Sequence, residues 1–252
     1  ENTRFFNANL EGADFSESDL PQTVFLEANL AGAVFRKARF EGAQFDDANL
    51  EGVDFSEASL FAGDLDGRDL TSVRFKGASL VQCSLCNADL RKADLTGCNM
   101  RDAEFTGSNL EEAVIRDVQA PGAVFCDANL KKALFHNFSA ENADFTGADL
   151  QQADLAGCEL PGTCFENSTL VKTGFRNANL KESRFNNADA QGAVFAGTIL
   201  DYRDVAAKSS FPRFVKPQRY IFTVGHAKPE FSPIQGIDQV PIDERFPFRP
   251  QF

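Results

Sequence analysis

The chain has 252 residues, six cysteines and no tryptophan, and its formal net charge at neutral pH is −12. An acidic surface repels the phosphate backbone of nucleic acid, so we expect no direct nucleic-acid binding. No apolar run approaches the ~20 residues that a membrane-spanning helix needs. The composition therefore favours a soluble protein without a transmembrane segment.

A period of five residues runs from Phe5 to Leu200. Of the forty positions in this register, sixteen are Phe, nineteen are Leu, one is Met and one is Ile, and the remaining three are Ala120, Ala140 and Ala190. A small residue, most often Ala, lies two places before nearly every one of them, and Asp or Asn directly precedes eighteen. A period of five fits neither a helix nor a plain strand. It indicates a repeat architecture.

A slower period of twenty residues shows how the pentads stack. Leu stands at every twentieth position from Leu10 to Leu170, and fifteen of the sixteen Phe fall on two other rows of the same period. Pro21, Pro121 and Pro161 differ by multiples of twenty, so they share one corner of a twenty-residue coil. Four pentads per coil are therefore expected, with both large and small residues of each pentad pointing inward.

The pentads resemble the A(D/N)LXX motif of the pentapeptide-repeat family, as in Ala8-Asn9-Leu10, Ala88-Asp89-Leu90 and Ala148-Asp149-Leu150. The resemblance covers residues 1–205. It implies an all-β fold: a right-handed, four-sided parallel β-helix. About ten coils stacked ~4.8 Å apart would make a rod on the order of 50 Å long.

Two segments depart from the repeat. In the first, Phe138 occupies a slot for a small residue, and Ala140 occupies one for a large residue in the same coil. Because the cross-section of a narrow solenoid is constant, we expect Phe138 to fill the space that Ala140 leaves. One coil earlier, Val118 similarly occupies a slot for a small residue, and Ala120 occupies a slot for a large one.

The second departure is Arg68, which stands in a small inward slot. A guanidinium buried among Phe and Leu would cost several kcal/mol unless it were paired. We therefore expect a local bulge, with Arg68 turned outward toward Asp64, Asp66 or Asp69. Such a bulge has two interpretations: an irregularity that the fold tolerates, or a notch that binds a partner.

The sequence holds no constellation of catalytic residues, no cofactor motif and no metal-ligand cluster. The two histidines are His136, on an outward corner, and His226, beyond the repeats. Cys83, Cys98 and Cys158 fall in small inward slots, while Cys86 and Cys126 share one corner but lie two coils apart, roughly 9.6 Å. Since a disulfide needs Cα atoms within about 7 Å, we expect reduced thiols. The regularly spaced carboxylates are typical of turns and solvated faces. We expect no enzyme.

Residues 206–252 differ from the repeat region. They carry seven of the ten prolines, seven Phe and a net charge of +3, which leaves −15 on residues 1–205. Proline at this density favours extended backbone, and aromatic and Arg side chains are typical anchors at interfaces. We predict an extended tail that either caps its own rod or docks on another chain. The predicted contact residues are Phe211, Arg213, Phe214, Arg219, Tyr220, Phe222, Phe246, Phe248 and Arg249.

Three functions agree with these features. The first is a scaffold that binds other proteins through its acidic faces and tail, as an accessory subunit of a multisubunit complex. The second is implied by the family resemblance, since some members mimic duplex DNA and bind DNA gyrase. The third is a secreted or lumenal binding module. The compartment stays open between an organelle, after loss of a targeting peptide, and the bacterial cytoplasm. Oligomeric state also stays open.

Overall fold

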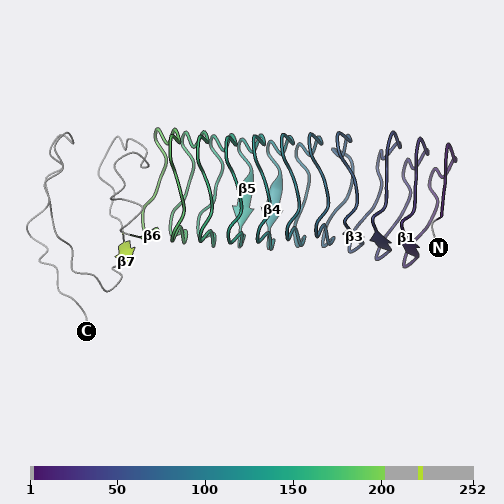
Figure 1. The fold of residues 1–252 in the computed structure, drawn as a ribbon, viewed down its shortest axis with the longest axis horizontal. Coiled ribbons are helices and arrows are strands. Elements are labelled where there is room, and N and C mark those ends of the chain that lie inside the picture. The colour runs from purple at the N-terminus through teal and green to yellow at the C-terminus, as the bar shows by residue number, and fades with distance from the viewer. Residues whose placement is uncertain (1–2, 202–220, 224–252) are drawn as a thin grey trace, which may run out of the picture.

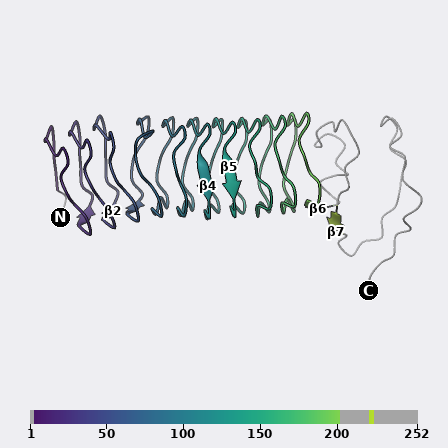
Figure 2. The same cartoon turned by 180° about the vertical axis from the view of Figure 1, so that it is seen from behind.

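The computed structural model describes residues 3–201 and 221–223, and these residues form a stack of parallel rungs. Figures 1 and 2 show the rungs from opposite sides as successive coils of one elongated rod, with the chain's N-terminus at one end. Each rung pairs with the rung twenty residues later, for example Asn9 with Asn29 and Asn29 with Asn49. The fold is a β-helix, and the described residues contain no α-helix.

Most rungs are single bridges, and a few extend to three-residue strands. The strands are β1 (Asp19–Pro21), β2 (Arg39–Glu41), β3 (Ser59–Phe61), β4 (Val114–Arg116), β5 (Leu134–His136), β6 (Ile199–Asp201) and β7 (Ile221–Thr223). All their pairings are parallel, in the order β1-β2-β3, β4-β5 and β6-β7. Such short strands follow from the pentad, because a turn interrupts the extended backbone every five residues.

The turn between rungs has one repeated geometry. The amide of most small inward residues donates to the carbonyl of the large residue three places earlier, as Ala8 does to Phe5 at 3.3 Å. The residue before the small one has positive φ at every fifth position from Asn7 to Gly197, except at Ser72. A positive φ at this position is the mark of a type II turn. Within the described residues, Ser72 is therefore the one turn of different geometry.

The core consists of the two inward positions of each pentad. Large inward residues such as Phe25, Phe75 and Leu130 are fully buried. The Phe rings stack from coil to coil, as in the pair Phe125 and Phe145, whose centroids lie 4.7 Å apart. The inward assignment made from the sequence is confirmed, because alternating large and small side chains fill the interior of the rod.

Phe138 is buried among the core residues and contributes one more ring to them. Its ring meets Phe135 edge-on, with centroids 4.9 Å apart. Val118, Ala120 and Ala140 are also fully buried. The positions where Ala replaces a large residue are therefore not exposed to solvent. The rungs around the substitution stay paired, since Ser139 donates to Val118 at 3.0 Å and Glu159 donates to Phe138 at 2.9 Å. This is the geometry expected from compensation between Phe138 and Ala140.

The predicted tail, residues 206–252, lies outside the described residues except for the backbone of β7. That backbone pairs in parallel with β6, in the register Ile199 with Ile221 and Leu200 with Phe222. The separation is 22 residues here, where the preceding rungs repeat every 20. β7 thus adds one rung to the edge that β6 presents.

Candidate interaction site

The parallel ladder is interrupted beside Arg68. In the neighbouring coil, three backbone bonds join each rung of the Leu10–Leu170 row to the next: Asn49 donates to Ala28, Leu30 donates to Asn49, and Gly32 donates to Glu51, at 2.7–2.9 Å. One coil later the corresponding bonds from Asp69 to Ala48, from Leu50 to Asp69 and from Gly52 to Thr71 are missing from the described structure. The rungs of residues 48–52 and 68–72 are therefore separated.

Within the described residues, all three rung bonds are missing on one side of the rod only. Before it, Gln44 still bridges Asp64 and Asp64 donates to Ala43 at 3.0 Å, but the bonds from Phe45 to Asp64 and from Asp47 to Asp66 are missing from the described structure. After it, Arg74 donates to Val53 at 2.9 Å. Above it, Leu70 donates to Asp89 at 2.8 Å and Asp89 donates to Arg68 at 2.9 Å, whereas the third bond, from Ser72 to Arg91, is missing from the described structure. A smaller opening follows on the next row, where Arg74 and Asp94 do not pair within the described part of the chain.

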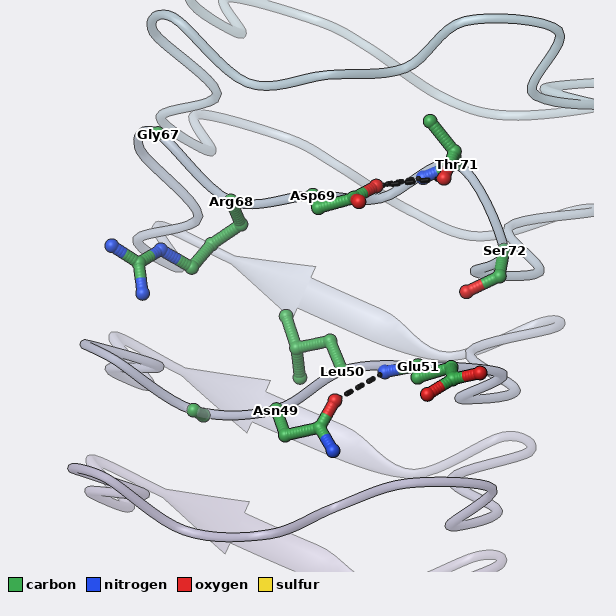
Figure 3. Close-up of a pocket in the computed structure, with 9 residues that line it drawn as sticks. Asn49, Leu50, Glu51, Gly67, Arg68, Asp69, Thr71 and Ser72 are labelled. Atoms are coloured by element: carbon green, nitrogen blue, oxygen red, sulfur yellow. Dashed lines mark hydrogen bonds between the residues drawn. The ribbon is translucent and has the colours of Figure 1, made fainter.

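A cavity of about 470 Å³ occupies the space between the two rungs. We call it the notch, and Figure 3 shows the residues that line it: Ala48, Asn49, Leu50, Glu51, Gly67, Arg68, Asp69, Thr71 and Ser72. In that view the Leu50 side chain points from its own rung toward the rung of Asp69. Leu50 is the apolar floor of the notch, and the rim is polar.

Arg68 lines the notch beside the separated rungs. Its guanidinium Nη1 lies 3.3 Å from Asp47 Oδ1, and its Nε donates to the carbonyl of Asp66 at 3.1 Å. The side chain is 25% exposed, so the charge has left the core as expected. The expected partners were wrong in one respect, because the carboxylate that pairs with Arg68 belongs to Asp47, in the preceding coil.

Ser72 links the two separated rungs at one end of the notch. Its hydroxyl accepts a hydrogen bond from the Gly52 amide at 2.9 Å, in place of the absent rung bond to Thr71. Asp69 accepts from the Thr71 amide at 3.0 Å and from its hydroxyl at 2.7 Å. These contacts fix the upper rim, but they leave the backbone groups of Ala48, Leu50 and Asp69 that face the notch without a described partner.

Two arginines hold the coils together beside the notch. Asp54 is 3% exposed and lies 2.7 Å from Arg36 Nε and 3.6 Å from Arg74 Nη1. Burial raises the pKa of this carboxyl, but hydrogen bonds from Ser56 and Arg36 outweigh the burial, and the net pKa is lowered. The ion pair joins three successive coils and limits how far the opening extends.

The other polar groups of the rod serve its own turns and core. Burial raises the pKa of Cys83, Cys98 and Cys158 to about 12, so these thiols stay protonated at neutral pH. All six cysteines are free, and His136 is exposed on an outward corner. Within the described residues, no group of His, Cys, Asp and Glu is arranged to hold a metal ion. The part of the chain that the structure describes has no helix suited to crossing a membrane.

The predicted contact residues of the tail are not brought together with the notch by any described contact. Phe222 contributes its backbone to β7. The remaining predicted contacts, which lie outside the described residues, are Phe211, Arg213, Phe214, Arg219, Tyr220, Phe246, Phe248 and Arg249. Among the residues that line the notch, the sequence had indicated Arg68 as a candidate for partner binding, but not Asn49, Leu50 or Ser72. One signal was present, because Ser72 is the only Ser at its turn position in the repeat.

Two family models match the chain. One, for a pentapeptide repeat region, matches residues 95–165, and the other, for pentapeptide repeats, matches residues 1–22, 24–60, 69–107 and 173–202. Residues 61–68 fall between matched segments, and they end at Arg68. A search of curated proteins found no significant match.

Several solved structures are similar. A trypsin-treated variant of QnrB1, titled a plasmid-mediated fluoroquinolone resistance protein, is 20% identical, covers 81% of this chain and 93% of its own, and has a TM-score of 0.57. HetL, titled a pentapeptide repeat protein involved in heterocyst differentiation regulation in the cyanobacterium Nostoc, is 24% identical over 79% and 91% of the two chains, with a TM-score of 0.41. The likeness to QnrB1 shows a shared fold.

Proposed function

The chain belongs to the pentapeptide-repeat family, and from this premise we propose that it is a non-catalytic scaffold. In this proposal it binds other proteins through the faces of an acidic rod and through its C-terminal tail, as an accessory subunit of a larger assembly. The rod would be a right-handed, four-sided β-helix of about ten coils that spans residues 1–205, with residues 206–252 as the tail.

The observation that supports this function is how the rod uses its acidic side chains. Aspartates that precede the large inward residue accept the amide two places later, as Asp14 does from Ser16 at 2.9 Å and Asp94 from Thr96 at 3.0 Å. Carboxylates that accept backbone amides in this way stabilise the turns and so keep the surface of the rod regular. Such a surface is long, regular and charged, which favours contact with other proteins over chemistry on a substrate.

Affinity purification from the native source tests this proposal. We expect the full chain to co-purify with the subunits of a complex. A chain truncated after Thr223 keeps β7 on the edge of β6, so it should stay folded and yet lose partners that depend on the tail. A chain truncated after Val205 lacks β7 as well, and its comparison with the first truncation separates loss of docking from loss of stability. Recovery of the full chain alone would contradict the proposal.

A second candidate is binding to DNA gyrase by mimicry of duplex DNA. It is supported by the charge of −15 on residues 1–205 and by the carboxylates of Asp46, Asp47, Asp64 and Asp66 on two adjacent coils. The sequence has no loop inserted between coils, and its tail does not resemble the dimerising helix of gyrase-binding members. In a supercoiling assay with purified gyrase, inhibition or protection by the full chain would favour this candidate over the scaffold.

A further inference from the structure

The notch presents the two halves of a parallel ladder with one rung missing. On its lower edge are the carbonyl of Ala48 and the amide of Leu50, and on its upper edge are the amide and carbonyl of Asp69. None of these four groups has a described hydrogen bond. Buried or edge backbone groups bind strongly to a partner that can satisfy them. The arrangement is therefore a template for extended backbone.

The adjacent coil shows what such a rung looks like when it is filled. Asn29 donates to Ala8 and accepts from Leu10, while Leu30 donates to Asn49 and Ala28 accepts from Asn49, at 2.8–2.9 Å. Three consecutive residues thus satisfy four groups on the rungs to either side. The same four groups are open in the notch, in the same order. A strand in parallel orientation would complete them.

The cavity is large enough for a ligand of this kind. A single water occupies roughly 30 Å³ in the liquid, whereas the notch measures about 470 Å³. The bonds from Asp64 to Ala43 and from Arg74 to Val53 limit it on its two flanks. The opening therefore admits a short stretch of chain and excludes a second folded domain.

The side chains around the notch restrict the sequence of the ligand. The Leu50 side chain points into the notch. An apolar residue of the ligand that points inward would pack against it. Asn49 accepts the Glu51 amide at 3.1 Å, while its own amide group donates to Asn29 at 3.0 Å. An incoming Asn could therefore extend this ladder of side chains by donating to Asn49. The acidic groups of Glu51 and Asp69 favour Lys or Arg after the apolar residue.

We propose that the notch binds an extended peptide segment of a partner protein, in parallel orientation, with an inward apolar residue followed by basic residues. This is strand addition inside a solenoid, and not at its end. The inference rests on the proposed protein-binding function and specifies one form of contact for it. Arg68 keeps the notch open in the free protein by its pairing with Asp47.

A synthetic peptide provides the test. The probe has the sequence of residues 127–133, Asp-Ala-Asn-Leu-Lys-Lys-Ala, because this rung supplies the inward Leu, the Asn and two lysines. In the rod, Asn129 donates to Asn109 at 3.0 Å and Lys132 pairs with Glu112 at 3.0 Å. The control peptide carries an N-methyl group on its Leu amide, which removes the donor to Asp69.

With the full-length protein, we expect the probe to bind and to slow hydrogen exchange at the amides of Leu50 and Asp69. The N-methylated peptide should bind at least tenfold more weakly. Glu51→Lys should weaken binding about tenfold, since it removes one charge-assisted contact. Glu11→Lys is the matched control, because Glu11 occupies the same repeat position two coils earlier, and it should leave binding unchanged.

Arg68→Ala tests the notch itself, because an Ala in this slot should let the ladder close and abolish peptide binding. Equal binding by native and Arg68→Ala proteins would overturn the inference, as would no binding at millimolar peptide, which would indicate a notch filled by water only. Co-purification distinguishes this failure from failure of the proposed function. Partners retained by both the native chain and the Arg68→Ala chain would leave the scaffold function standing while the notch inference fails.

Discussion

The segments around Phe138 and Arg68 break the same rule and respond in opposite ways. Each puts a large residue into a slot for a small one. At Phe138 the rungs remain paired and the ring is buried against Phe135. Beside Arg68 all three rung bonds between residues 48–52 and 68–72 are missing from the described structure, and a cavity of about 470 Å³ opens. Excess volume can be balanced by a neighbour such as Ala140, but a charge cannot be balanced by volume, so the backbone yields.

The largest effect should come from repeating the Arg68 situation in an intact coil. Ala88 is 1% exposed in a small inward slot. Ala88→Arg should destabilise the protein by about 5 kcal/mol, because an unpaired guanidinium would enter the core. Urea unfolding measures this change.

Ala88→Ser is the control for that prediction. Ser108 occupies the same slot one coil later and donates to the carbonyl of Phe105 at 2.7 Å, so Ser should be tolerated at position 88. A stable Ala88→Arg protein with an intact ladder would show that charge alone does not open the rungs.

Phe138→Ala should destabilise by about 3–5 kcal/mol, because it leaves a cavity beside Ala140. The double variant Phe138→Ala with Ala140→Leu should recover much of this loss, since it restores the ordinary repeat. Both values come from urea unfolding. If the double variant were no more stable than the single one, compensation between the two residues would be wrong.

Arg68→Ala should change stability in the other direction. Closure of the ladder would restore three rung bonds, which we expect to add about 1–3 kcal/mol. Hydrogen exchange at the Leu50 amide should slow to the level of Leu30. Arg91→Ala removes an arginine that is 53% exposed, and this control should change stability by less than about 0.5 kcal/mol. Fast exchange at Leu50 in the Arg68→Ala protein would contradict the role of Arg68.

Asp54→Asn should destabilise by about 1–2 kcal/mol at neutral pH, because it weakens the charged contacts to Arg36 and Arg74 that restrain the notch. The folded-state pKa of Asp54 is lowered. Its contribution is therefore present above the unfolded pKa of about 3.9 and is lost as the pH falls through the folded value. The native and variant proteins should converge in acid. Asp94→Asn, on the same row but exposed, is the control, and equal effects of the two changes at neutral pH would exclude a special role for Asp54.

The inward positions of the rod could be predicted from the sequence, because each pentad repeats the same local turn and the same two buried side chains. Forty copies of the pattern from Phe5 to Leu200 leave one register. The burial of Phe138 agrees with the exchange that the sequence indicated, since Phe138 and Ala140 belong to the same coil, but compensation between the two residues stays a prediction. The tail contacts stay a prediction, apart from the backbone of β7.

The notch could not be predicted from the sequence, because it depends on contacts between coils. The sequence indicated that Arg68 would leave the core, but three carboxylates near it in the chain were equally available. Asp47 is the partner in the structure, 21 residues away, because stacking brings the preceding coil as close as the next residues of the chain. The missing rung bonds, the altered turn at Ser72 and the open groups at Leu50 and Asp69 lie beside this pair. Local pattern determines which residues face inward, whereas the spacing between rungs depends on pairing across coils, which no single pentad encodes.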